Sequence, residues 1–186
     1  MNFWQRSVGV VALVVLSACS TLPQHEAGID GVACVGMVGA MPAGLAAASN
    51  DELMKQARLA TDKGGVCTAR VWVVQQPVKV YRVYDSRRSY SQFGRWWALS
   101  KPTGSRDVYR AEYGICPTWS GLDHLVSCTL KPNTQIVVGT TQSVDCGDAP
   151  HTAYPKTANL QVYVPNAPND VRVENCQDEG AWPAQQ

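Results

Sequence analysis

The chain has 186 residues, of which 16 are Lys or Arg and 15 are Asp or Glu, so its formal net charge is only +1. This balance gives no overall attraction to nucleic acid or to an acidic lipid surface, and we expect no nucleic-acid partner. Hydrophobic residues make up 45% of the sequence and include six tryptophans. A chain of this size and composition can bury one ordinary hydrophobic core, so we predict a single globular domain.

The amino-terminal residues have the pattern of a secretory signal peptide that ends at a cysteine. Arg6 precedes an apolar run from Val8 to Leu16, and a basic residue before roughly 7–15 apolar residues is typical of such signals. The run is too short to cross a bilayer, which takes ~20 residues. Two small residues then lead to Cys19. We predict cleavage before Cys19, which removes residues 1–18 as the signal peptide.

The string Leu16-Ser17-Ala18-Cys19 resembles the lipobox of bacterial lipoproteins. In that family the cysteine thiol receives a diacylglyceryl group, and a fatty acid such as palmitate acylates the new amino terminus. The resemblance implies lipidation of Cys19, because two or more acyl chains hold a protein stably on a membrane. Ser20, in place of Asp, implies sorting to the outer membrane, with the domain facing the periplasm or the cell surface. The alternative is a soluble secreted protein in which Cys19 lies near the cleavage point by chance.

Six cysteines remain when Cys19 is set aside. They are Cys34, Cys67, Cys116, Cys128, Cys146 and Cys176. An even set outside the cytoplasm, where thiols are oxidised, predicts up to three disulfide bonds. The sequence alone leaves the pairing open. Neighbours along the chain tend to meet around hairpins, which favours Cys34 with Cys67, Cys116 with Cys128 and Cys146 with Cys176.

Residues 19–48 are expected to contain the lipidated cysteine, a polar tether and a segment rich in Gly and Ala. Each glycine disfavours a helix by up to ~1 kcal/mol relative to Ala, so we expect a loosely ordered loop that is tied down at Cys34. The globular domain is expected to span residues 49–186.

One helix is predicted from about residue 50 to residue 61. Ser49 and Glu52 have the spacing of a capping box, with a hydroxyl at the N-cap and a carboxylate three residues later. Leu53, Met54 and Ala57 then follow on one side of the helix. The Gly64-Gly65 pair is the predicted stop, because glycine tolerates the left-handed backbone that ends helices.

From Cys67 onward, short β-branched and aromatic runs alternate with Pro, Gly and Asn. The strongest predicted strands are residues 71–74 and 78–84. Further predicted elements are strands at 95–99, 125–130, 134–139 and 160–164, a turn at Pro132-Asn133 and a short helical turn at 109–113. The fold class is therefore α+β, with a small mixed or antiparallel sheet, one amino-terminal helix and stabilising disulfides.

Familiar catalytic and metal-binding patterns are missing from the sequence. His25, His124 and His151 lie in unrelated segments with no second ligand at helical spacing, and no cysteines form a CxxC pair, so we expect no metal. Asp123 beside His124 could support a general base, but adjacent side chains point in different directions, which favours a surface or capping role. There is no GxSxG motif, and a cysteine in a disulfide is not a nucleophile.

Three segments supply candidate ligand-binding residues. Arg82 lies inside an aromatic-flanked strand, where a guanidinium needs an anionic partner, either a ligand phosphate or carboxylate or an acidic residue of the chain. Trp96 and Trp97 are adjacent indoles, one of which could cover an aromatic ligand. Gln142 lies in a small polar loop after the strand at 134–139.

The string from Val80 to Arg87 resembles the first conserved strand of bacterial ADP-ribosyltransferase toxins of the pertussis and cholera kind. The order of arginine strand, aromatic segment and Gly-x-x-Gln loop is also similar to NAD glycohydrolases related to the tuberculosis necrotizing toxin. The resemblance implies NAD as a substrate, with catalytic roles for Arg82 on its phosphates or ribose and for Gln142 on the ribose. Trp96 or Trp97 would flank the nicotinamide. No Glu-x-Glu or Gln-x-Glu pair follows Gln142, so transfer to a protein is not implied.

The competing hypothesis is an envelope lipoprotein that binds a protein partner or ligand and needs no cofactor. Aromatic residues and Arg dominate interface hot spots. Basic residues also gather between residues 82 and 110, where they could meet an anion or form a solvated face. This hypothesis predicts a contiguous exposed aromatic patch away from any cleft, with Trp96, Trp97 and Trp119 not all buried. NAD cleavage instead predicts that Arg82, one indole and Gln142 line one cleft.

Overall fold

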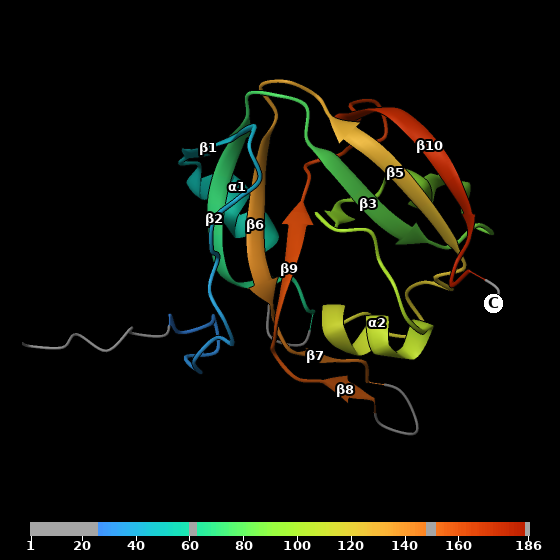
Figure 1. The fold of residues 1–186 in the computed structure, drawn as a ribbon. Coiled ribbons are helices and arrows are strands. Elements are labelled where there is room, and N and C mark those ends of the chain that lie inside the picture. Colours follow the sequence, from blue (N-terminus) through green and yellow to red (C-terminus); the bar gives the residue numbers. More distant parts are fainter. Residues whose placement is uncertain (1–25, 60–62, 148–151, 185–186) are drawn as a thin grey trace, which may run out of the picture.

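The computed structural model describes residues 26–59, 63–147 and 152–184. The predicted signal peptide, Cys19 and two of the three histidines, His25 and His151, lie outside these residues. Within the described ranges, no helix is long and apolar enough to cross a membrane. Two curved sheets face each other and enclose the core (Figure 1).

The two sheets contain only antiparallel pairs. The larger has the order β1-β2-β6-β9-β4, with β1 at Leu45–Ala48, β2 at Val66–Val74, β6 at Gln135–Thr141, β9 at Thr157–Tyr163 and β4 at Trp96–Trp97. The smaller has the order β10-β5-β3, with β10 at Val173–Ala181, β5 at His124–Leu130 and β3 at Lys79–Tyr84. A separate hairpin pairs β7 (Val144–Asp145) with β8 (Ala153–Tyr154).

The sheets are joined at one corner. Ala98, directly after β4, exchanges backbone hydrogen bonds of 2.8 and 2.9 Å with Tyr81 of β3. The two sheets are thus joined through β4 and β3 into one strongly bent sheet. Strands β1 and β10 are its outer edges. The β10 edge is polar and irregular, because its register with β5 shifts at two places and it carries Glu174, Asp178 and Glu179.

Strand alternation separates the core into layers. On β6, Ile136 and Val138 face the cluster between the sheets, and Val137 faces outward, as the period of two in a strand requires. Helix α1 (Asp51–Ala57) covers that outer face with Leu53 and Ala57. Helix α2 (Arg106–Tyr113) packs through Tyr109 against Leu122, Leu125 and Trp182.

The α+β class with antiparallel sheets and disulfides is confirmed, with two helices in place of one. The predicted strands and the turn at 109–113 all correspond to observed elements. Helix α1 begins one residue later than expected and ends at Ala57 with Arg58 as its C-cap, so the expected end near residue 61 with Gly64-Gly65 as the stop is wrong. Asn50, not Ser49, is its N-cap and accepts a hydrogen bond from Leu53 N at 2.9 Å. The segment expected to be a loose loop contributes β1, and residues 45–48 thereby belong to the larger sheet.

Three disulfides link the described cysteines: Cys34–Cys67, Cys116–Cys146 and Cys128–Cys176. The first pairing is confirmed, and the other two preferred pairings are wrong. Cys128 lies in β5, and its sheet neighbour is β10, which carries Cys176. The preference for neighbours along the chain failed there because β10 is too polar to be recognised as a strand from its sequence.

Candidate functional site

A cavity of about 180 Å³ opens where β3, β4 and β9 meet the loop after α2. It is lined by Lys63, Gly65, Arg82, Val83, Trp96, Tyr113, Gly114, Ile115, Trp119, Ser120, Leu122 and Gln161. Sites for drug-sized ligands measure about 300–1,000 Å³. This cavity is smaller, and its size suits one protruding side chain or a small ring.

Arg82 lines the cavity, but its guanidinium donates hydrogen bonds to the protein's own backbone. Its Nε donates to Ser91 O at 2.7 Å and its Nη1 to Trp96 O at 2.6 Å. Gly94 lies so close to the guanidinium that a Cβ there would come within 2.3 Å of Nη2. Burial lowers the pKa of Arg82 to about 10, so the side chain remains a cation at neutral pH. Arg82 therefore joins β3 to the short helix η1 (Ser89–Phe93) and to β4.

The two adjacent indoles have different environments. Trp97 is buried in the main core and donates its Nε1 hydrogen to Gly94 O at 2.8 Å. Trp96 lines the cavity and meets the ring of Tyr163 edge to face, with 5.1 Å between centroids. Of the two residues expected at a ligand, only Trp96 is placed to touch one. Trp119, which was expected only as part of an exposed aromatic patch away from any cleft, lines the cavity and is 43% exposed.

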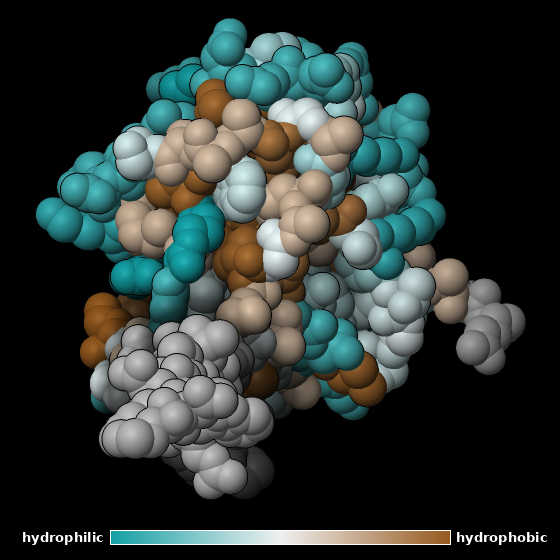
Figure 2. Space-filling model, turned by 60° about the vertical axis from the view of Figure 1, so that its left-hand side comes forward, coloured by the Kyte–Doolittle hydropathy of each residue, from teal (hydrophilic) through white to brown (hydrophobic). Residues whose placement is uncertain are grey.

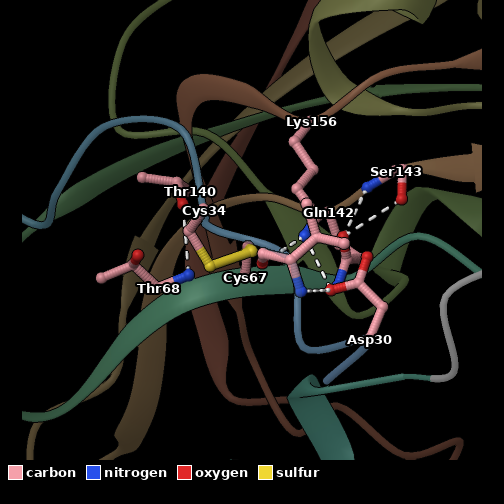
Figure 3. The surroundings of a disulfide bond; sticks show 9 residues. Asp30, Cys34, Cys67, Thr68, Thr140, Gln142, Ser143 and Lys156 are labelled. Atoms are coloured by element: carbon pink, nitrogen blue, oxygen red, sulfur yellow. Dashed lines mark hydrogen bonds and ion pairs between the residues drawn. A yellow bond between two sulfur atoms is a disulfide. The ribbon is translucent and has the colours of Figure 1, made fainter. Parts of the chain in front are cut away.

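Gln142 does not line the cavity, although its backbone N donates to the lining residue Gly65 at 3.0 Å. Its side chain is fully buried beside the Cys34–Cys67 disulfide (Figure 3). Its Oε1 accepts hydrogen bonds from Ser143 N at 2.9 Å and from Ser143 Oγ at 3.2 Å. Among the described residues, no hydrogen-bond acceptor meets its Nε2. Arg82 and Gln142 thus do not share the cleft that NAD cleavage requires.

The amide in the cavity belongs to Gln161 of β9. Its Nε2 donates to Thr141 Oγ1 at 3.0 Å and to the carbonyls of Gly65 and Tyr113 at 3.3 Å. These bonds hold β9 to the turn before β2 and to the end of α2. One sequence signal could have identified it, because Gln161 is a polar residue between Leu160 and Val162 in a buried strand.

Most of the basic residues between 87 and 110 have partners inside the domain. Arg87 pairs with Asp85 at 3.0 Å, and Lys101 pairs with Glu179 at 2.7 Å. Arg110 is buried and donates to the carbonyls of Ile115, Cys116 and Ser120. These side chains brace the loops between β3 and β5, which argues against a single anion-binding surface.

Asp123 caps the turn that follows β3, and His124 lies beside it. Ser86 donates to Asp123 from its backbone N and from its Oγ, each at 2.7 Å, and these bonds lower the pKa of the Asp123 carboxyl against the opposing effect of burial. His124 Nδ1 lies 3.6 Å from Asp123 Oδ1. Ser86 is therefore bonded to the acid and not to the imidazole, an arrangement that does not activate a hydroxyl. Among the described residues, no cluster of three or more potential ligands could hold a metal ion.

Exposed aromatic side chains lie on the loop that lines the cavity and on η1, which does not line it but contacts the cavity residue Arg82. Tyr90 and Phe93 belong to η1, which Arg82 binds, and Trp119 belongs to the loop after α2. Arg88 connects the two segments by donating to Trp119 O at 3.3 Å. We call Tyr90, Phe93 and Trp119 the aromatic rim.

No family model, no curated protein and no solved structure matches this chain. Function is therefore argued from the residues and geometry described above.

Proposed function

We propose that the protein is a lipid-anchored component of the bacterial envelope whose domain binds a protein partner through the aromatic rim and the cavity behind it. The anchor rests on the lipobox at Cys19. Three disulfides suit an oxidising compartment outside the cytoplasm. The partner is expected to insert one side chain, because the cavity volume of about 180 Å³ matches a side chain better than a larger ligand.

The observation that carries the proposal is the exposure of Trp119 at the cavity. An indole that is 43% exposed beside a hollow is typical of a binding hot spot, since large aromatic residues next to pockets dominate interface energetics. The same cavity supports NAD cleavage less well. Gln142 does not line it, and Arg82 already has two backbone acceptors.

The test is photo-crosslinking in intact cells. A photoreactive amino acid replaces Trp119, and a matched control places it at Val108, an exposed residue of α2. We expect one discrete adduct from position 119 and none from position 108. The partner is then identified, purified and titrated. Trp119→Ala should weaken binding by about 30-fold, which corresponds to ~2 kcal/mol for a hot spot, and Val108→Ala should change it less than twofold.

Two outcomes would contradict the proposal. Equal adducts from both positions would remove the aromatic rim as the binding surface. Release of nicotinamide from NAD by the purified protein, abolished in both Arg82→Ala and Gln142→Ala variants that remain folded, would favour the glycohydrolase instead. Mass spectrometry of the amino terminus tests the anchor separately, because lipidation adds the mass of acyl chains to Cys19.

A further inference from the structure

Residues 31–48, which we call the apolar strap, contain no charged residue. Much of the strap is nevertheless exposed, with Val32 60%, Val35 46% and Met37 63% accessible. Figure 2 shows this side of the molecule, where apolar residues run together down the middle of the face and hydrophilic residues border them. A continuous apolar area on a domain surface marks a site of contact with another apolar surface.

The strap is held firmly against the sheet. Cys34 is bonded to Cys67 of β2, and its backbone N donates to Glu26 O at 2.8 Å. Gly36 packs so closely on Ala158 that a Cβ there would lie 2.7 Å from the Cβ of Ala158. At its carboxyl end the strap becomes β1 and pairs with β2. The exposed side chains are therefore presented in a fixed arrangement and need little ordering to bind.

Charges at the start of the strap are already neutralised. Lys156 donates to Asp30 Oδ1 and to Val32 O, both at 2.7 Å (Figure 3), and this contact lowers the pKa of the Asp30 carboxyl. Glu26 pairs with Arg70 at 2.7 Å. An apolar medium can approach the strap without isolating a charge, which would otherwise oppose the contact strongly. Lys55, Arg58 and Asp51 line a groove with Ile29 just before the strap, where these charged groups can remain at the polar level of a membrane.

The position of the strap along the chain favours a lipid bilayer as the surface that it contacts. Residues 19–25 separate the predicted lipidated cysteine from the first described residue, Glu26. Even fully extended, this stretch spans only about 25 Å, at ~3.5 Å per residue. The tether therefore keeps Glu26 within about 25 Å of the anchor, and the exposed apolar residues that begin at Ile29 follow directly after it.

We propose that the apolar strap is a membrane-contacting surface, and that it sets the orientation of the domain by inserting Val32, Val35 and Met37 among phospholipid acyl chains. This inference rests on the proposed function for the anchor at Cys19. It adds a second attachment that involves the folded domain itself. The aromatic rim lies on other segments, η1 and the loop after α2, and so stays available for a partner.

The experiment places an indole in the strap and measures its contact with lipid. The mature protein that carries Met37→Trp is extracted from membranes. The control carries Val108→Trp, at an exposed position on α2. Each is reconstituted into phosphatidylcholine vesicles with and without bromine on the acyl chains, which quenches nearby indoles. Subtracting the quenching measured for the protein without an added tryptophan removes the signal of its native tryptophans. We expect at least twofold stronger quenching at position 37 than at position 108.

A charge in the strap supplies the second variant. Val32→Asp, added to Met37→Trp, changes an exposed residue and should preserve the fold and the disulfides, as circular dichroism and peptide mapping would verify. We expect it to reduce the quenching at position 37 to the level of the control. Equal quenching at positions 37 and 108, or quenching at position 37 that survives Val32→Asp, would overturn the proposal.

The remaining outcomes separate the two proposals and the other occupants. If mass spectrometry finds no lipid at Cys19, the anchor proposal fails. The unlipidated chain is then mixed with the same vesicles. Quenching at position 37 supports the membrane contact of the strap, and no quenching there overturns it. Concentration-dependent dimerisation in solution that Val32→Asp abolishes would assign the strap to a second copy of the chain and would overturn the membrane assignment.

Discussion

At the scale of single residues, one buried carboxylate organises the turn after β3. Asp85 is only 1% exposed and accepts hydrogen bonds from Arg87 Nε and Nη2 at 3.0 Å and from the backbone N of Gly121 at 3.1 Å. These contacts, led by the Arg87 side chain, hold the pKa of the Asp85 carboxyl well below its ordinary value of 3.8. Asp85 thereby connects β3 to the loop that contains Trp119.

We predict that Asp85 makes the domain sensitive to acid. The unfolded carboxyl takes up its proton near pH 3.8, whereas the folded carboxyl stays ionised to lower pH. The resulting stabilisation is full above about pH 5 and declines as the pH falls through 4 and below. Urea unfolding of wild type and Asp85→Asn should therefore differ most at pH 7 and converge toward pH 2. Glu174→Gln, at an exposed position of β10, should behave like wild type throughout. A difference that is constant with pH would contradict this role.

At the scale of elements, Arg82 acts as a connector. It lies on β3 and binds the carbonyls of Ser91 in η1 and Trp96 in β4, so it fixes the segment that crosses from one sheet to the other. A guanidinium inside a strand was expected to need an anion or an acidic side chain as its partner. Backbone carbonyls fill that role instead.

We predict that Arg82→Ala costs about 3 kcal/mol of unfolding free energy, since two hydrogen bonds from a charged donor are lost and two carbonyls lose their partner. Arg82→Lys should cost roughly half as much, because one ammonium keeps the charge but does not reproduce both bonds of the planar fork. Urea unfolding at pH 7 measures both values. Arg58→Ala, an exposed residue at the end of α1, is the control and should be neutral. An Arg82→Ala variant as stable as wild type would show that the connection is dispensable.

Sequence patterns predicted the elements that carry a clear period and missed those that the tertiary structure imposes. The strand at 78–84 alternates visibly, and it corresponds to β3. The edge strands β1 and β10 were not predicted, because Leu45–Ala48 consists of a leucine and three alanines and Val173–Ala181 is largely polar. Their strand structure comes from pairing with β2 and β5.

The same limit applied to the candidate site. Arg82 and Trp96 were predicted and do share the cavity. Gln142 was selected for its polar loop, but its amide turns back onto Ser143. Gln161 was not selected although its place in an apolar strand was a local signal, and Trp119 was expected away from any cleft. Only the folded chain brings β9 and the loop after α2 together at the cavity. Long-range packing of this kind leaves little trace in local sequence.

At the scale of the whole molecule, each disulfide joins segments that are distant in the chain, with sequence separations of 33, 30 and 48 residues. They tie the strap to β2, the loop after α2 to β7, and β5 to β10. Closing loops of these lengths stabilises a fold by about 3–4 kcal/mol each. The sum is comparable to the ~5–15 kcal/mol by which a typical domain is stable.

We predict that the fully reduced protein is unfolded at 37 °C, whereas the oxidised protein is folded. Near-ultraviolet circular dichroism, which reports the packing of the buried tryptophans, should show this on addition of a phosphine reductant. Buffer without reductant is the control, and reoxidation should restore the signal together with the pairing Cys34–Cys67, Cys116–Cys146 and Cys128–Cys176 on peptide mapping. A native spectrum in the reduced protein would mean that the core alone maintains the fold.

For a domain anchored at Cys19 as proposed, the polar edge of the bent sheet has a consequence in a crowded membrane. Proteins anchored in one leaflet meet at high local concentration, and two regular strand edges would then pair into larger aggregates. Strand β10 presents Glu174 and Asp178 together with two breaks in register, so two such edges repel one another and cannot align their hydrogen bonds. The opposite edge, β1, is only four residues long. Neighbouring copies should therefore diffuse past one another as separate molecules, however densely they populate the surface.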